Sequence, residues 1–354
     1  KATQGGLLSF CPGGERGRLP GDGVAANLRM RCGSDPDGRS SSVSQFATNC
    51  PEVGGAMIYI GTSGWSYPTG EGRWEGVFYP RGSGVDRLEF YSRYFKAVEI
   101  NSSFYRPIYP NVARSWAKKT PADFRFTAKL YQKFTHPRMY EEAAGEPAEL
   151  VAADYDRFRS GLDPLMEAGK LGCLLAQFPP SFKHDEESLT YLEDLIRQFD
   201  GYPLAVELRH RSWSDSPDTF SLLASRGVAW CMIDEPRFRT SVGEVPVTSR
   251  IGYFRFHGRN AREWWTGDRE TRYNYLYSRE EVRSLAGDVR EVAERTEDSF
   301  VFYNNHYGAK AVVNALQMKL ELGQAVAEEP PPSLLERYPE LTQWLRRGDL
   351  DREG

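Results

Sequence analysis

The chain has few cysteines, no long apolar run and no excess of either charge. Five cysteines are too few for a disulfide scaffold in a chain of 354 residues, and they include no Cys-x-x-Cys pair. No stretch approaches the roughly 20 apolar residues that span a bilayer, and the first thirty residues lack the apolar segment of a secretory signal. Lys and Arg number 45 against 49 Asp and Glu, so no strongly basic field covers the whole chain. We therefore predict a cytoplasmic protein without a membrane partner. The overall charge does not exclude a local basic cleft, and nucleic acid is therefore not excluded as a partner.

What the sequence does contain is a rhythm of short β-rich runs that begins at Met57. The runs cover residues 58–61, 97–101, 124–129, 171–178, 204–209, 228–234, 253–257 and 300–304. Helical patterns lie between them, with long helices predicted over 150–169 and 278–296. Eight strands alternating with helices predict an α/β fold, a (β/α)8 TIM barrel in one domain over residues 57–323. An open doubly wound sheet competes, but the Gly-x-Gly-x-x-Gly turn of such folds is missing after the first strand.

The two flanking segments differ from the barrel region in composition. Residues 1–56 are rich in Gly, Ser, Asp, Arg and Pro and show no sustained periodicity. We predict that they are a disordered extension, or one translated from upstream of a natural start at Met57. Residues 324–354 begin with an acidic, proline-rich linker at 325–332 and continue into a short helix, predicted over 334–345, that packs on the outside of the barrel.

Strand parity assigns a set of charged side chains to the barrel interior. Successive side chains alternate across a strand, and the apolar face must meet the helices. In residues 97–101, Val98 and Ile100 therefore face the helices while Glu99 faces inward. The same alternation predicts an interior that contains Glu99, Arg125, Lys129, Glu207, Arg209, Arg255 and His257. These charges must neutralise one another, because an unpaired buried ion is strongly destabilising.

Two interpretations of this charged interior compete. One is a closed network of ion pairs that merely fills the barrel. The other is a functional site, and position favours it. Five of the polar side chains lie at or within two residues of the C-terminal ends of their strands, where barrel enzymes carry their chemistry: Glu99, Lys129, Glu207, Asp234 and His257.

Several multi-residue motifs occur in a characteristic order. They are IGTSGW at 60–65, GVFYP at 76–80, VEINSSFY at 98–105, FRFTAK at 124–129, AQFPP at 176–180, AVELRH at 205–210, FRFHG at 254–258 and FYNNH at 302–306. Together they resemble the domain of unknown function 72 family, also called YecE-like, from residue 57 to about residue 323. The resemblance implies a single-domain TIM barrel and supplies neither a reaction nor catalytic residues.

We expect an enzyme, a hydrolase or lyase that acts by general acid/base catalysis on a sugar-containing or phosphorylated small molecule. Glu207 and Glu99 are the expected acid/base pair, and Lys129 and Arg209 are expected to hold an anionic group or to lower a carboxyl pKa. His257 and Asn304 are expected to position the substrate. The other side chains expected at the site are Trp65, Tyr105, His136, Gln177, Trp213, Arg255 and His306.

Two alternatives remain from the same residues. A metal-dependent isomerase or phosphodiesterase would use Glu207, Asp234, His257 and His306 as ligands of a divalent metal. No His-x-His or His-Glu-x-x-His spacing supports it, so we assign no metal residue and no cofactor. A binding module for an anionic or aromatic ligand, or for nucleic acid, is the alternative from another class. Paired carboxylates beside a lysine favour the enzyme. The sequence carries no signal for an oligomeric state.

Overall fold

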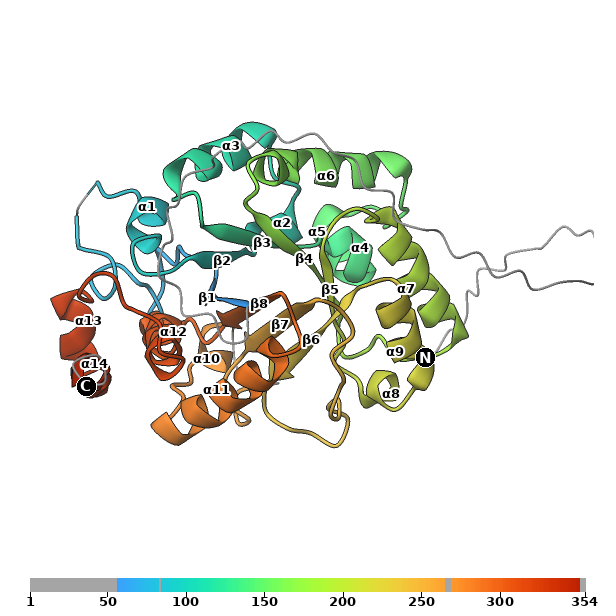
Figure 1. Ribbon diagram of the computed structural model, residues 1–354. Coiled ribbons are helices and arrows are strands. Elements are labelled where there is room, and N and C mark those ends of the chain that lie inside the picture. Colours follow the sequence, from blue (N-terminus) through green and yellow to red (C-terminus); the bar gives the residue numbers. More distant parts are fainter. Residues whose placement is uncertain (1–55, 83, 265–268, 351–354) are drawn as a thin grey trace, which may run out of the picture. The chain divides into compact units, whose positions relative to one another are not determined.

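The structure, a computed structural model, describes residues 56–82, 84–264 and 269–350. The extension predicted over 1–56 lies outside the described residues except for Ala56. Eight parallel strands close into a barrel in chain order, so the predicted (β/α)8 architecture is confirmed (Figure 1). The strands are β1 (Met57–Ser63), β2 (Ala97–Ile100), β3 (Arg125–Lys129), β4 (Leu171–Gln177), β5 (Leu204–Glu207), β6 (Ala229–Asp234), β7 (Ile251–Phe256) and β8 (Asp298–Tyr303).

Helices of very different length connect the strands. Those before β5 are α1 (Arg87–Tyr91), α2 (Ser102–Tyr105), α3 (Pro110–Lys119), α4 (Gln132–Thr135), α5 (Pro137–Ala144), α6 (Ala152–Glu167) and α7 (Glu186–Gln198). Those after β5 are α8 (Arg211–Ser214), α9 (Pro217–Ser225), α10 (Arg269–Arg272), α11 (Arg279–Ala293), the 3-10 turn η1 (Tyr307–Ala309) and α12 (Lys310–Glu321). Figure 1 shows these helices as a ring around the strands. None of the described helices is long and apolar enough to cross a membrane.

The alternation of side chains along the strands separates two apolar clusters. Val98, Ile100, Phe126 and Phe254 belong to the cluster between strands and helices, as parity predicts. A second cluster fills the lower part of the barrel interior and contains Tyr59, Ala97, Cys173, Leu175, Ala205, Ala229, Cys231, Tyr253, Phe300 and Phe302. The buried ion pairs between Arg255 and the two glutamates Glu99 and Glu207 lie in the upper part of the interior, toward the carboxyl ends of the strands. Arg125, predicted to lie inside, begins β3 at the opposite end, where its guanidinium covers the Tyr59 ring at 5.6 Å.

The connection from β6 to β7 departs from the regular pattern. Residues 235–250 are all described and form no helix. Val242, Val245 and Val247 of this segment pack against the core where a helix would lie. Pro236, Gly243 and Pro246 are poor helix formers, so the missing helix has a local cause in the sequence.

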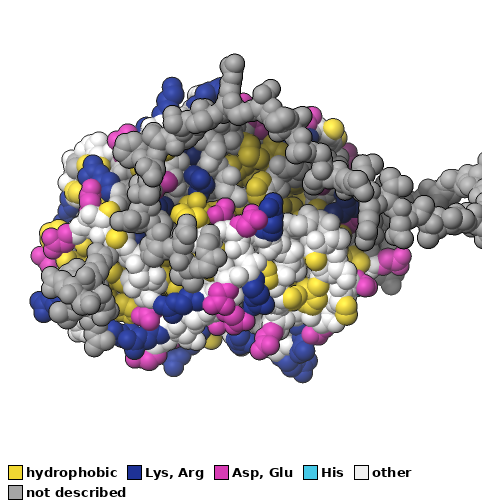
Figure 2. Space-filling view, in the orientation of Figure 1, with side chains coloured by type: hydrophobic (Ala, Val, Ile, Leu, Met, Phe, Trp, Pro, Cys, Tyr) yellow, Lys and Arg dark blue, Asp and Glu magenta, His cyan; other side chains and the backbone are white. Residues whose placement is uncertain are grey.

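Two helices, α13 (Pro332–Arg337) and α14 (Glu340–Leu350), occupy the C-terminal region where one was predicted. Leu334, Leu341 and Trp344 are buried in the outer cluster, and Figure 1 shows both helices outside α12. Figure 2 shows acidic and basic side chains mixed over the visible face, without a patch of one sign.

Candidate functional site

Four charged side chains meet above the apolar floor of the barrel. Glu99 comes from β2, Glu207 ends β5, Arg255 comes from β7, and Arg209 follows β5 by two residues. Glu99 and Glu207 are 0% exposed and Arg255 is 2% exposed. Strand parity placed all four inside the barrel, and the structure confirms this orientation.

Arg255 lies between the two carboxylates and binds both. Its Nε and Nη2 donate to Glu99 Oε2 and Oε1 at 2.9 and 2.8 Å, and its Nη1 donates to Glu207 Oε2 at 2.5 Å. The Tyr253 hydroxyl also donates to Glu99 Oε2 at 2.9 Å. Each carboxylate is thus satisfied by neighbours within the barrel, and Arg255 is fixed in one orientation.

Arg209 completes the cluster. Its Nε donates to Glu207 Oε1 at 2.6 Å, and its Nη1 lies 3.4 Å from Glu235 Oε2. Burial opposes ionisation of Glu207, but the guanidiniums of Arg209 and Arg255 outweigh it and hold the pKa of this carboxyl well below its ordinary value. Glu207 is therefore a permanent anion at physiological pH.

His257 is a neutral side chain within the same cluster. Burial, and next the charge of Arg209, lower the pKa of His257 to about 3. Its Nε2 lies 3.1 Å from Arg209 Nη2, and because a guanidinium can only donate, Nε2 is the acceptor. The other ring nitrogen, Nδ1, lies 3.0 Å from the side-chain nitrogen of Asn304.

A cavity of about 450 Å³ opens above this cluster. Many of its walls come from residues at the carboxyl ends of strands: Asn101, Lys129, Gln177, Arg209 and Asn304. Eight of the predicted site residues line it, namely Tyr105, Lys129, His136, Gln177, Arg209, Arg255, Asn304 and His306. The expectation that a site lies at the carboxyl ends of the strands thus agrees with the position of this cavity.

Lys129, the last residue of β3, projects into this cavity with an unpaired ammonium. Its Nζ lies 3.8 Å from the centre of the Phe104 ring, and among the described residues no carboxylate or other acceptor binds it. Burial, and next the charge of Arg255, lower the pKa of Lys129 to about 7. His136 lines the same cavity, and burial followed by the charge of Lys129 lowers the pKa of its imidazole to about 3.

Glu99, Glu207 and His257 require a correction of their expected positions. They lie beneath the cavity and do not line it, because their polar atoms are turned toward Arg255 and Arg209. In these positions Glu99 and Glu207 cannot contact a substrate in the cavity as an acid/base pair. They instead hold the cationic groups that face the cavity.

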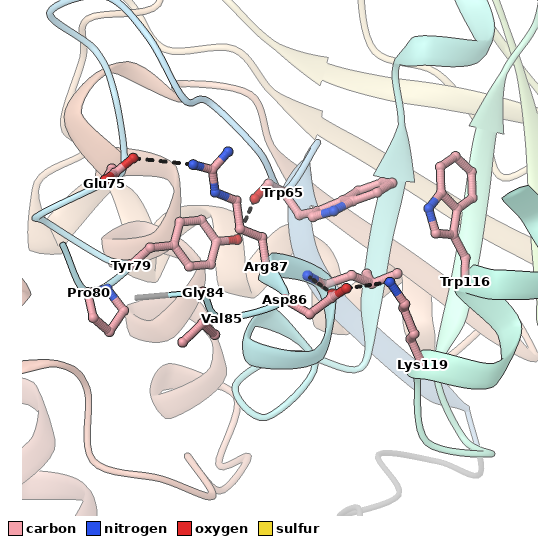
Figure 3. A pocket seen from close by; sticks show the side chains of 11 residues that line it. Trp65, Glu75, Tyr79, Pro80, Gly84, Val85, Asp86, Arg87, Trp116 and Lys119 are labelled. Atoms are coloured by element: carbon pink, nitrogen blue, oxygen red, sulfur yellow. Dashed lines mark hydrogen bonds and ion pairs between the residues drawn. The ribbon is translucent and has the colours of Figure 1, made fainter. Parts of the chain in front are cut away.

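The two predicted tryptophans also lie elsewhere. Trp213 is 0% exposed, and its Nε1 donates to the carbonyl of Phe182 at 2.8 Å, so it packs within the protein rather than against a ligand. Trp65 lines a neighbouring cavity of about 490 Å³ and packs edge-on against Trp116 at 5.1 Å (Figure 3).

The charges of that neighbouring cavity are all used in pairs. Figure 3 shows Arg87 joined to Glu75, with Nη2 and Oε2 3.3 Å apart, and Lys119 joined to Asp86. This cavity is therefore a poorer candidate for binding a charged ligand, and Lys119 provides a matched control for Lys129.

Sequence reasoning missed several lining residues. They are Tyr67, Phe104, Met139, Pro179, Pro180, Arg272 and Tyr273, together with Asn101. Asn101 directly follows β2 and could have been found by the strand-end rule. Tyr67 stacks on His306 with the ring centres 4.3 Å apart, a contact between the loops after the neighbouring strands β1 and β8 that no local pattern indicates. Arg272 and Tyr273 come from the long connection after β7, which has no periodicity to place them.

The four residues considered as metal ligands do not converge. Asp234 binds Arg259, with Oδ2 2.6 Å from Nη2, and accepts from the Tyr277 hydroxyl at 2.7 Å. It lines a separate cavity on the outer side of β6 and β7. Among the described residues, no group of three or more His, Cys, Asp or Glu is arranged to hold a metal ion. A metal-dependent reaction stays a prediction from the sequence.

Comparison with known proteins gives a consistent result. A profile of the family described as "Protein of unknown function DUF72" matches residues 59–336. The UPF0759 protein YunF of Bacillus subtilis is 33% identical over 279 residues, which cover 75% of this chain and 94% of YunF. The UPF0759 protein YecE of Escherichia coli is 31% identical over 156 residues, 44% of this chain and 49% of YecE.

Solved structures of similar proteins agree with the barrel. The crystal structure of a DUF72 family protein from Thermotoga maritima has a TM-score of 0.65 at 37% identity and covers 76% of this chain and 100% of its own. A DUF72 family protein from Enterococcus faecalis has a TM-score of 0.66 at 27% identity, covering 78% of this chain and 98% of its own.

Proposed function

The chain belongs to the DUF72 family, and we propose that it is an enzyme, a hydrolase or lyase acting on an anionic, sugar-like small molecule such as a sugar phosphate. The observation that carries this proposal is the arrangement of Lys129, Arg209 and Arg255 around one cavity at the carboxyl ends of the strands. Lys129 is the proposed acid/base group, and the two arginines bind the anionic part of the substrate.

The preference for an anion follows from how the arginines are held. Glu99 and Glu207 fix Arg255 from below, and Glu207 also fixes Arg209. Donors that are held before the ligand arrives lose little freedom on binding and stabilise negative charge effectively. Planar guanidiniums suit phosphate and carboxylate groups in particular.

The remaining lining residues suit a hydroxylated ligand. The amides of Asn101, Gln177 and Asn304 offer hydrogen bonds to hydroxyl groups. The stacked pair of Tyr67 and His306, and the Tyr105 ring at 52% exposure, offer flat faces for a sugar ring.

Proton transfer is assigned to Lys129 instead of the glutamates. A catalytic group works best when its pKa lies near the operating pH, and the pKa of Lys129 is lowered to about 7. Glu207, whose pKa is held well below its ordinary value, is a poor proton acceptor at the same pH. The glutamates are positioning residues in this proposal.

A thermal-shift experiment on the full chain tests the proposal. Glucose 6-phosphate and ribose 5-phosphate are compared with glucose and ribose, since a ligand at 100 times its Kd stabilises a fold by about 2.7 kcal/mol. We expect the phosphorylated compounds alone to raise the Tm, equally in the wild type and in Lys119→Met, and the shift to be smaller in Lys129→Met, which removes one of the three basic side chains at the cavity. Mass spectrometry of the same mixtures then detects turnover.

The outcomes separate the alternatives. A Tm shift accompanied by a product that Lys129→Met does not form supports the enzyme. A shift without any product supports the binding module. A shift that survives in Lys129→Met but disappears in Lys119→Met moves the site to the neighbouring cavity and refutes the proposal.

A further inference from the structure

Lys129 differs from the buried lysines of the described residues in having no hydrogen-bond acceptor. Three lysines are buried at 9% exposure or less, Lys133, Lys170 and Lys319. Lys170 donates to the carbonyls of Ala117 and Thr120, both at 2.6 Å, and the others are similarly bonded. Within the described part of the chain, the Lys129 ammonium has neither an ion pair nor a hydrogen bond, although it lies in a cavity with two glutamates nearby.

The backbone of Lys129 is fixed, so the amine is presented from a rigid position. The Ser103 hydroxyl donates to the Lys129 carbonyl at 2.6 Å, and the amide of the next residue, Leu130, donates to the carbonyl of Leu175 at 2.8 Å. Residues on the ends of barrel strands hold reacting groups more precisely than residues on loops. Lys129 is thus placed as a reacting group and lacks the bonds of a structural one.

The surroundings of Lys129 favour the neutral amine over the ammonium. Burial and the Arg255 guanidinium at the same cavity both disfavour the ammonium, and they outweigh the attraction of the Phe104 ring for a cation at Nζ. Desolvation and a neighbouring cation are the two conditions under which lysines become nucleophiles toward carbonyl compounds. The lowered pKa of Lys129 is in keeping with this environment.

We propose that Lys129 forms an imine with the carbonyl group of an aldehyde or ketone that also carries a phosphate or carboxylate, the anionic group being bound by Arg209 and Arg255. The inference rests on the proposed function and narrows it, because imine chemistry belongs to a lyase that breaks a bond next to a carbonyl and not to a hydrolase.

The step balances without any oxidant or reductant. The lone pair of the neutral amine forms a bond to the carbonyl carbon, the carbon–oxygen π pair moves to oxygen, and a proton passes from nitrogen to that oxygen. The resulting carbinolamine loses hydroxide, which leaves as water after taking a proton from solvent, and the nitrogen lone pair forms the protonated carbon–nitrogen double bond. When the carbon–carbon bond next to the iminium carbon breaks, its electron pair forms an enamine, and the other fragment leaves as a carbonyl compound after its hydroxyl group gives up a proton. The enamine carbon takes up a proton to restore the iminium, and hydrolysis then releases the second carbonyl product and the free amine.

Reductive trapping on the full chain tests the proposal. Glycolaldehyde phosphate and glycolaldehyde are each mixed with the protein and sodium cyanoborohydride at pH 7.5, and the adduct is located by peptide mass mapping. We expect the phosphorylated aldehyde to modify Lys129 on the order of 100-fold faster than an ordinary lysine, because a pKa of about 7 leaves far more neutral amine than one near 10.4. The unphosphorylated aldehyde should show a weaker preference for Lys129, because it meets the same neutral amine but lacks the anionic group that the arginines bind.

Two variants keep the test decisive. Lys129→Arg retains a cation at the cavity but cannot form the imine, so it should lose the adduct and keep the phosphate-dependent Tm shift. Lys119→Met should behave like the wild type. Adducts spread over surface lysines such as Lys118, with Lys129 unmodified, refute the imine. If the Tm shift by sugar phosphates persists in that case, only the imine fails and the proposed function stands; if the shift is also missing, both fail.

Discussion

Arg255 and Glu99 form a pair joined by two hydrogen bonds inside the barrel. Nε and Nη2 of the arginine each donate to a different oxygen of the carboxylate, at 2.9 and 2.8 Å. The pair is closed to solvent, and the third guanidinium nitrogen binds Glu207. A single side chain therefore binds two carboxylates that belong to different strands of the barrel, and Arg209 supplies the second positive charge.

Removal of Arg255 should be strongly destabilising. Arg255→Met leaves two buried carboxylates without their main partner, and we expect the free energy of unfolding in urea to fall by about 3–5 kcal/mol. Arg250→Met is the control, because the pair between Arg250 and Glu297 is exposed at 81% and 66%. Its loss should change the free energy by less than about 1 kcal/mol. Equal effects of the two variants would show that the buried cluster is not a stabilising feature.

The stability of the fold should depend on pH through Lys129. The pKa of this amine is about 7 in the folded chain and near 10.4 in an unfolded one. Between these values the unfolded chain binds more protons at this position, so the free energy of unfolding rises with pH, by at most about 1.4 kcal/mol per unit. Below pH 7 the contribution is constant. Urea unfolding of the wild type and Lys129→Met from pH 6 to 10 should show this rise as a difference between them. A constant difference over that range would contradict the lowered pKa.

The imidazole of His257 should remain neutral throughout the physiological range. Its pKa is lowered to about 3, so nitrogen chemical shifts measured between pH 5 and 8 should not titrate. The spectrum of His257→Gln identifies the signals. A midpoint near 6.5 would mean that the ring is in contact with water and that the cluster is open.

Two helical glycines should respond to alanine in opposite directions. A Cβ on Gly161 in α6 would lie 2.1 Å from the carbonyl oxygen of Ile108, whereas a Cβ on Gly287 in α11 meets nothing within 4 Å. Gly161→Ala should therefore lower the free energy of unfolding by about 1–3 kcal/mol through overpacking. Gly287→Ala should raise it by about 0.5–1 kcal/mol through helix propensity. Thermal melts of both variants measure the effects. An increase in stability in both variants would show that α6 can shift away from the loop that contains Ile108.

The sequence predicted the barrel and the direction of its side chains because both depend on local periodicity. The alternation of polar and apolar residues over 97–101 was sufficient to predict that Glu99 faces the barrel interior and Val98 the helices. Their positions at or just after strand ends were sufficient to predict that Lys129, Gln177 and Asn304 line one cavity. Both rules work because parallel strands of a barrel all end on the same side.

The partners within the site could not be predicted in the same way. Parity places Glu207 inside the barrel but does not say that two arginines bind it, because that depends on the register between β5 and β7, which are not neighbours. Composition likewise misplaced Trp213. An aromatic residue after a strand can line a cavity or fill the wall behind it, and only packing distinguishes the two.

The layer of aromatic and small side chains below Arg255 makes the cavity a blind one. Tyr253, Phe300 and Phe302 belong to the buried cluster of the barrel interior, and the interior of such a barrel is a packed core and not a pore. Substrates must therefore enter, and products must leave, through the same opening of the cavity. A long polymer has no way through and can present only an end. The fold thus favours small ligands, or the terminal unit of a polymer, over an internal unit of a polymer.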